Sequence, residues 1–239
     1  MSGFSVRKKG LKDFVTDIFF PNVCPFCEKV IPWNISCCEE CCDEICSNAD
    51  KAAENLCPVC GRFICKCDSE RILYDRCFTA GIYEDKTRNA VLSMKYRNDN
   101  NAAEIFSELL YRNISSADSI CFDLVTCVPM NSRKERKRGY NQAEKLAELL
   151  AEKLEVPMRN DLLIHSYSKV SQHDRNAEER RESVMTEYFA SQNAELSGEN
   201  ILLCDDVMTT GSTLSRCAEI LKDIGAESVT AAVCAAVIH

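Results

Sequence analysis

From residue 75 onward, short apolar runs alternate with stretches whose apolar residues recur at helical spacing. In residues 141–154, for example, Leu146, Leu149, Leu150 and Leu154 fall on one helical face. Strands that alternate with helices predict a parallel sheet covered by helices on both faces, which is an α/β fold. We expect strands at 78–83, 123–128, 162–165, 201–204 and 228–238, and helices at 87–96, 102–112, 141–154, 177–186 and 214–224.

The amino-terminal part of the chain has a different pattern. Residues 21–70 show no alternation of strands and helices and carry few large apolar side chains. A segment of this size cannot hold itself together by apolar burial alone. We therefore expect two units: residues 1–74, with an amino-terminal helix and a cysteine-rich module, and residues 75–239, the α/β domain.

The cysteines supply the missing stabilisation. Eleven of the 17 cysteines lie between Cys24 and Cys67. A Cys-x-x-Cys turn directs two thiolates at one ion, and two such turns complete the four-sulfur tetrahedral site that suits zinc. Such a site leaves no position for catalytic water, so the expected role of the metal is structural. The spacing resembles two zinc ribbons in series, with the ligands Cys24, Cys27, Cys38, Cys41, Cys57, Cys60, Cys65 and Cys67.

The cysteine pattern leaves alternatives open. Cys37 and Cys42 offer a second register beside the favoured Cys38 and Cys41. The last pair has one intervening residue instead of two, so the module holds one or two ions. Reduced cysteines without metal are another interpretation. A redox Cys-x-x-Cys is a further one, but it needs a strand–helix context that residues 21–70 lack.

Residues 201–213 combine an apolar run, two acids and a loop rich in hydroxyl groups. The pattern predicts a central strand, a loop at its carboxyl end and a helix from Leu214 onward. Ligands of open α/β sheets bind at this end of the strands. Small residues that open a helix present backbone N–H groups suited to a phosphate. The paired acids next to this loop are explained if they bind sugar hydroxyls or a divalent cation.

This arrangement resembles the binding motif for 5-phosphoribosyl 1-diphosphate (PRPP) of type I phosphoribosyltransferases. The resemblance implies that Asp205 and Asp206 hold the ribose hydroxyls and act as the catalytic residues, and that 209–213 wrap the 5-phosphate. The alternative is a core strand followed by a capped helix, without a ligand site. The expected PRPP-binding residues are Asp205, Asp206, Val207, Met208, Thr209, Thr210, Gly211, Ser212 and Thr213.

A basic segment follows the strand expected at 123–128, on the same side of the sheet as the phosphate loop. Together with Lys95 it is a candidate clamp for pyrophosphate, since cationic side chains stabilise the charge that develops on a leaving group. A solvated basic loop and a contact with single-stranded DNA are the alternatives. The segment contributes Arg133, Lys134, Arg136, Lys137 and Arg138.

Four blocks together resemble the ComF/GntX family: the paired cysteines, residues 94–99, residues 137–143 and residues 201–213. The resemblance covers nearly the whole chain. It implies a zinc ribbon region joined to a type I phosphoribosyltransferase-like domain. It also implies participation in natural competence, in which imported single-stranded DNA is received in the cytoplasm with a helicase-like partner.

Two functions are consistent with these features. The first is a PRPP-dependent phosphoribosyltransferase, in which pyrophosphate leaves bound to Mg²⁺ and the protein acts by positioning and charge stabilisation. The second is a non-catalytic PRPP-binding adaptor whose zinc module docks a helicase-like partner or single-stranded DNA. A PRPP-sensing nucleic-acid regulator is disfavoured by the formal charge of −8.

The chain shows no sign of membrane insertion or secretion. Its longest mild apolar stretch, residues 229–238, is half the ~20 residues that a spanning helix needs. Charged residues interrupt the apolar part of the amino terminus, unlike a secretory signal. We therefore expect a cytoplasmic protein, in which the cysteines stay reduced.

Overall fold

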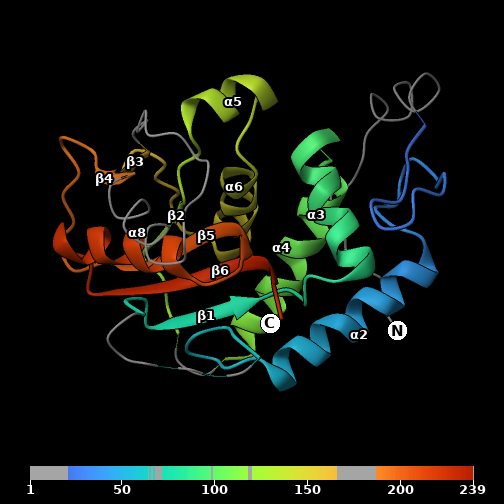
Figure 1. The fold of residues 1–239 in the computed structure, drawn as a ribbon, viewed down its shortest axis with the longest axis horizontal. Coiled ribbons are helices and arrows are strands. Elements are labelled where there is room, and N and C mark those ends of the chain that lie inside the picture. Colours follow the sequence, from blue (N-terminus) through green and yellow to red (C-terminus); the bar gives the residue numbers. More distant parts are fainter. Residues whose placement is uncertain are drawn as a thin grey trace, which may run out of the picture.

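The fold is seen in a computed structural model that describes residues 21–63, 65, 67, 72–97, 99–117, 120–165 and 187–238 (Figure 1). The expected amino-terminal helix and the expected helix at 177–186 lie outside these residues. No helix in the described ranges is both long enough and apolar enough to cross a membrane.

A parallel sheet forms the centre of the molecule, and its strand order is β1-β6-β5-β2. The central strands β5 and β6 are almost fully apolar over 201–204 and 229–236, as expected for strands covered on both faces. The predicted parallel sheet is confirmed. Its strands are β1 Arg76–Thr79, β2 Leu124–Cys127, β5 Asn200–Met208 and β6 Ser228–Ala236.

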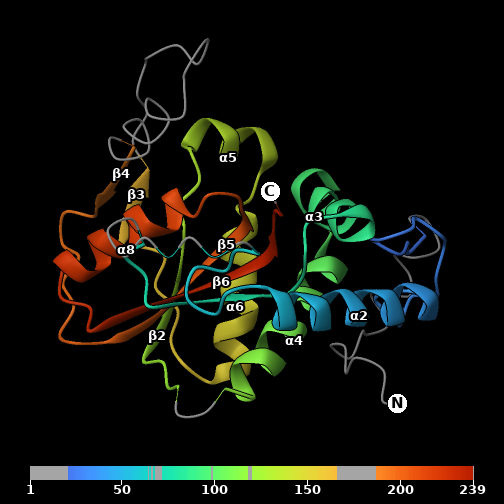
Figure 2. The same cartoon turned by 60° about the horizontal axis from the view of Figure 1, so that its bottom comes forward.

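Helices cover both faces of this sheet (Figures 1 and 2). Alternate residues of β5 separate the two sides: Leu202 packs into one core with α3, α4 and α6, whereas Ile201 and Leu203 pack into the other with α8. Both cores therefore depend on the same strand. The helices are α3 Asp85–Arg97, α4 Asn100–Ser115, α6 Gln142–Leu154 and α8 Ser212–Asp223.

Polar side chains fix where these helices begin. The Asn141 side chain accepts a hydrogen bond from the N–H of Ala143 and donates to the carbonyl of Val128, which ties the start of α6 to the end of β2. Asn141 is therefore the N-cap of α6. Asp99 caps α4 in the same way through the N–H groups of Asn101 and Ala102.

One predicted strand does not join the central sheet. Strand β3, Leu163–His165, pairs antiparallel with β4, Tyr188–Ala190, and the two form a small sheet that contacts α8. The sequence analysis did not predict β4. Three-residue strands give only a weak hydrophobic pattern, and of these two short strands only β3 was predicted.

The cysteine-rich segment differs most from expectation. A helix, α2 Glu39–Asn55, separates the two cysteine groups, and the antiparallel pairing among residues 21–38 is a single bridge between Val23 and Val30. Helix α2 packs along α3 and α4 and ends near β1 (Figure 2). Its Ile45 and the nearby Phe26 enter the same core as Phe106 of α4. Apolar burial against the α/β domain thus supplies part of the stability that the segment lacks on its own.

Candidate functional site

Strand β5 carries both acids of the phosphate-loop motif. The strand does not end at Cys204, as the sequence analysis expected, but continues through Asp205 and Asp206 to Met208 because it stays paired with β6. The Oδ1 atom of Asp205 accepts a hydrogen bond of 2.8 Å from the N–H of Asp206. The paired acids therefore have a rigid backbone before the loop begins.

A lysine from another part of the chain reaches these acids. The Nζ atom of Lys95 lies 3.1 Å from Oδ2 of Asp206, and each side chain is about one-fifth exposed. Lys95 is held in place because Val91 and Met94, which lie on the same helix α3, are buried. The Tyr140 hydroxyl also donates to the Met94 carbonyl, so the segments around 95 and 140 are in contact.

The local environment makes Asp205 a weak acid for a carboxyl group. Burial and the negative charge of Asp206 raise the pKa of Asp205 to about 7, against the lowering effects of the Asp206 N–H and of Lys95. A carboxyl group with such a pKa changes charge near neutral pH. Polar ligand hydroxyls or a cation at this point would stabilise its charged form.

The loop after β5 has the geometry of an anion site. Thr209 and Thr210 are exposed, and Gly211 has a φ of +75°, a conformation that glycine adopts without steric cost. The Thr210 hydroxyl lies 2.9 Å from the Ser212 hydroxyl. Helix α8 begins at Ser212, and the N–H groups of a first helical turn have no partner within the helix. The loop therefore offers hydroxyl groups and N–H groups together.

The basic segment is a short helix, α5 Ser132–Arg138, for which the sequence analysis predicted no secondary structure. Arg136 and Lys137 are exposed, as is Arg133, whereas Arg138 is partly buried. The Arg138 guanidinium donates to Oε1 of Gln142 and lies 5.5 Å from the ring centre of Tyr96. The side chain of Lys134 lies outside the described part of the structure. Because β2 and β5 are parallel neighbours, α5 follows the same edge of the sheet as the phosphate loop.

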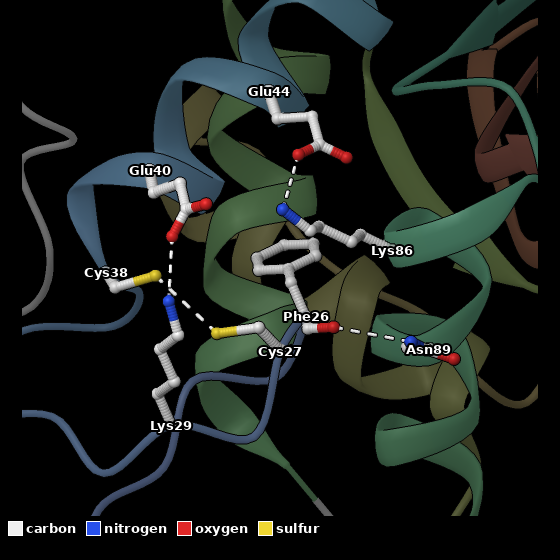
Figure 3. A network of polar contacts seen from close by, with 8 residues as sticks. All are labelled: Phe26, Cys27, Lys29, Cys38, Glu40, Glu44, Lys86 and Asn89. Carbon is white, nitrogen blue, oxygen red and sulfur yellow. Dashed lines mark hydrogen bonds and ion pairs between the residues drawn. The ribbon is translucent and has the colours of Figure 1, made fainter.

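The first cysteine group brings together Cys24, Cys27, Cys38 and Cys41, whose sulfur atoms all lie within 4.8 Å of one another. Cys38 precedes α2 and Cys41 lies in its first turn, opposite the turn that carries Cys24 and Cys27. Figure 3 shows Lys29 paired with Glu40 across this group, and Lys86 of α3 paired with Glu44. Cys37 and Cys42 are not part of the four-sulfur group.

The second cysteine group brings together Cys57, Cys60, Cys65 and Cys67 within the same 4.8 Å. A tight turn holds the first pair, because the N–H of Gly61 donates to the carbonyl of Cys57 and the N–H of Cys57 donates to the carbonyl of Arg62. Burial alone would raise the pKa of Cys57, but the N–H groups of Cys60 and Val59 and the neighbouring thiols lower it to about 6.

Both groups fit a four-thiolate metal ion. Four sulfurs at ~2.3 Å from one ion lie ~3.8 Å from each other. The sulfur atoms lie 3.6 Å apart for Cys27 and Cys38, 3.5 Å for Cys57 and Cys67, and 4.0 Å for Cys60 and Cys65. The sulfurs of Cys65 and Cys67 lie closer, at 2.9 Å, and would have to move apart to bind one ion. N–H groups directed at Cys57 favour its thiolate form, which is the form that binds metal.

The structure adds two residues to the site that the sequence analysis missed. The Arg62 guanidinium donates to the carbonyl of Thr210, and the Tyr74 hydroxyl lies over Gly211. Both come from the amino-terminal 74 residues, far from the phosphate loop in sequence. No local pattern marks them, because only the folded chain brings them next to residues 208–211.

Comparison with known proteins identifies the class. Residues 137–239 match the family model described as Phosphoribosyl transferase domain. Competence protein F of Haemophilus influenzae is 25% identical over 77% of this chain and 86% of its own length. Competence protein ComFC of Bacillus subtilis is 27% identical over 75% and 76%, respectively. DNA utilization protein YhgH of Escherichia coli K12 is 25% identical over 77% and 85%.

The parallel sheet with its phosphate loop is therefore a phosphoribosyltransferase-type domain, preceded by a cysteine-rich module. Among solved structures, adenine phosphoribosyltransferase from Thermoanaerobacter pseudethanolicus is 18% identical, with 62% of this chain and 73% of that chain covered at a TM-score of 0.37. The curated matches extend beyond this domain and cover about three-quarters of the sequence. Over this length the chain is similar to these competence and DNA utilization proteins at 25–27% identity.

Asp205 destabilises the folded protein at neutral and alkaline pH. Its pKa is higher in the folded than in the unfolded chain, so stability is lost as the pH rises from about 4 to about 7. We expect Asp205→Asn to unfold at a higher temperature than the wild type at pH 8 but not at pH 4. The gain in free energy of unfolding at pH 8 should be at most about 4 kcal/mol. Thermal unfolding at the two pH values measures the difference. An equal effect at both would contradict the charge argument.

Proposed function

We propose that this protein binds PRPP at the carboxyl end of β5. Asp205 and Asp206 bind the 2′- and 3′-hydroxyls of the ribose, and residues 207–213 bind the 5-phosphate. The observation that carries the proposal is the continuous strand, acid pair and hydroxyl-lined loop that opens α8. A helix start of this kind favours a phosphate group through its N–H groups and its dipole.

The pyrophosphate of PRPP is bound, in this proposal, by Lys95 and by the basic residues of α5. Lys95 lies beside Asp206, so one cation is already held at the ribose end of the site. Arg133, Lys134, Arg136, Lys137 and Arg138 supply further positive charge at the same edge of the sheet. Mg²⁺ bound to PRPP would neutralise part of the charge of the leaving pyrophosphate.

We further propose that the protein is a phosphoribosyltransferase. Breaking the bond between the anomeric carbon and pyrophosphate leaves a positive charge on the ribose ring. The chain would contribute by orienting the ribose through the two acids and by stabilising the departing pyrophosphate through Lys95. A PRPP-binding adaptor without turnover is the alternative. It would bind PRPP through the same residues but would not stabilise the departing pyrophosphate.

A role in DNA uptake is supported by the names of the relatives. They are called competence proteins in Haemophilus influenzae and Bacillus subtilis, and a DNA utilization protein in Escherichia coli. We propose that this chain acts in the same process, in the cytoplasm, with a helicase-like partner. Free cysteines at all 17 positions are consistent with a reducing compartment.

We propose that each cysteine group holds one zinc ion, as a structural centre. Four thiolates close the coordination sphere and leave no position for a catalytic water. The ions would fix the turns at Cys24–Cys27 and Cys57–Cys60. The described residues before position 75 are thus distinct in sequence pattern, yet they contribute to both apolar cores of the α/β domain.

A second candidate ligand is single-stranded DNA. Tyr96 is 72% exposed, an unusual state for an aromatic ring, and it stacks with the Arg138 guanidinium beside the basic residues of α5. Stacking platforms next to cationic side chains are typical of proteins that bind single strands. This surface adjoins Lys95, which precedes Tyr96 in α3.

PRPP binding tests the main proposal. We expect Asp205→Asn and Asp206→Asn each to weaken the binding of PRPP with Mg²⁺ by roughly tenfold or more, because each removes a charged acceptor for a hydroxyl group. Isothermal titration calorimetry measures this. Asp161→Asn is the matched control, since that exposed carboxylate pairs only with Arg159 in the described structure. Wild-type protein that does not bind PRPP would refute the proposal.

Release of pyrophosphate distinguishes the enzyme from the adaptor. We expect the wild type to release pyrophosphate from PRPP and Lys95→Met to release it more slowly by roughly tenfold, with PRPP binding less affected. A coupled pyrophosphate assay measures the rate. Tight PRPP binding without any release, for a range of acceptor bases and amines, would support the adaptor.

Metal content tests the cysteine groups. The purified protein should contain about two zinc ions per chain, and Cys27→Ser or Cys57→Ser should each contain about one. Elemental analysis, or titration with a chelating dye, measures the zinc content per chain. Cys46→Ser is the control, because Cys46 lies outside both groups. Retention of two ions by Cys57→Ser would contradict the assignment.

Contact with single-stranded DNA is tested through Tyr96. We expect Tyr96→Ala to weaken the binding of an oligo(dT) strand by roughly fivefold or more, and Tyr96→Phe to retain it, since the ring face is what a base stacks on. Fluorescence anisotropy measures binding. Equal affinities for the wild type and Tyr96→Ala would exclude a stacking role for this side chain.

A further inference from the structure

The second cysteine group lies directly against the phosphate loop. Three features of the described structure connect them: a hydrogen bond from Arg62, the placement of Tyr74 and the close packing of Gly61. The segment 57–62 and the loop 208–211 are about 150 residues apart in sequence. Their contact is therefore a product of tertiary structure alone.

Arg62 supplies the most direct connection. It follows Cys60 by two residues, and its carbonyl accepts the hydrogen bond from the N–H of Cys57 that closes the turn. Its Nη2 atom donates to the Thr210 carbonyl, in the middle of the phosphate loop. Its Nε atom is buried and has no hydrogen-bond partner in the described part of the chain. One residue thus belongs to the turn and also holds the loop.

Tyr74 and Gly61 form the second connection. The Tyr74 hydroxyl donates to the carbonyl of Cys60 at 3.1 Å and lies 3.7 Å from the sulfur of Met208. A Cβ atom at Gly211 would lie 2.8 Å from that hydroxyl, and one at Gly61 would lie 2.6 Å from Cε of Met208. Burial raises the pKa of Tyr74, so its hydroxyl stays protonated as a donor. The cysteine turn and the loop are packed without room for an extra methyl group.

The first cysteine group makes different contacts. It packs against α3 and α4: Phe26 meets Phe106 edge to face at 6.3 Å, and Asn89 donates to the Phe26 carbonyl (Figure 3). None of the described hydrogen bonds joins it to residues 208–213. The two groups are therefore not equivalent, so the first group can serve as an internal control for the second.

We propose that the second cysteine group positions the phosphate loop, so that metal binding at Cys57, Cys60, Cys65 and Cys67 and ligand binding at residues 209–213 strengthen each other. Arg62 is the positioning residue through which this coupling acts. The inference rests on the proposed phosphate-binding role of the loop. It goes beyond that role by assigning the metal centre a regulatory function at the same site.

The physical reason is conformational entropy. A metal ion on four thiolates fixes the turn from which Arg62 extends, so the guanidinium is held where it meets Thr210. Without the ion, the turn must be ordered by the ligand, and that cost reduces the affinity for the ligand. Because such coupling is reciprocal, the ligand must increase the affinity for the metal by the same factor.

Hydrogen exchange tests the coupling without any activity or ligand. In the metal-loaded full chain, the amides of Ser212 and Ser215 report on the loop, because they donate to the Thr210 hydroxyl and to the Gly211 carbonyl. We expect both to exchange roughly tenfold faster in Arg62→Ala than in the wild type, and Arg62→Lys to retain part of the protection. Lys86→Ala is the matched control, since it removes a cation that joins α2 to α3 near the first group. Equal exchange in Arg62→Ala and the wild type, with both ions retained, would overturn the proposal.

A second variant covers the case in which Arg62→Ala loses metal. Tyr74→Phe keeps the ring over Gly211 and removes the hydroxyl that contacts Cys60, so it is expected to fold and to retain both ions. We expect faster exchange of the Ser212 and Ser215 amides in this variant as well. Unchanged exchange here would count against the coupling in the same way.

Metal release provides the reciprocal measurement. Saturating PRPP with Mg²⁺ should slow the chelator-driven release of zinc from Cys27→Ser, which keeps only the second group, by roughly tenfold. Release from Cys57→Ser, which keeps only the first group, should be unaffected. If the wild type fails to bind PRPP, the proposed function fails while the exchange result still decides the coupling. If PRPP binds but both groups release zinc at unchanged rates, the coupling alone is refuted.

Discussion

Two adjacent carboxyl groups at the end of a buried strand are the constraint around which this site is organised. Asp205 and Asp206 repel each other, and burial adds to the cost of charging them, which is why the pKa of Asp205 rises to about 7. The chain accepts this arrangement because β5 stays paired with β6 beyond the two acids and because Lys95 supplies an opposite charge. Local destabilisation of this kind is common where a ligand is meant to complete the site.

The cysteine module is held by two kinds of force that act at different places. Near the first group, Phe26 and Ile45 enter the core of the α/β domain, so apolar burial contributes alongside the sulfur atoms. Near the second group, Tyr74 and Met208 pack in the other core, and Arg62 and the Tyr74 hydroxyl add hydrogen bonds. The first group therefore anchors the segment to the domain, whereas the second group lies against the loop at 208–211.

Much of the fold was predictable because its elements are long and strongly patterned. The helix at 141–154 and its Asn141 cap, the central parallel strands and the strand–loop–helix order at 201–224 all follow from periodicity and local chemistry. Short or polar elements were missed: β4 has three residues, and α5 consists largely of charged side chains that carry no apolar stripe. The helical structure of 39–55 was hidden by its three cysteines, which the sequence analysis assigned to a metal-binding module without regular structure.

The sequence by itself determined which groups can do chemistry: paired thiols, paired acids, a hydroxyl-rich loop and a cluster of cations. These signals are local, because a metal turn or a phosphate loop needs its residues within a few positions of each other. Only the tertiary structure decided which of these groups meet. The pairing of β5 with β6 and β2 aligns the acids with Lys95, and the path of α2 carries the second cysteine group back to the loop, since such contacts depend on packing between segments that are distant in the chain.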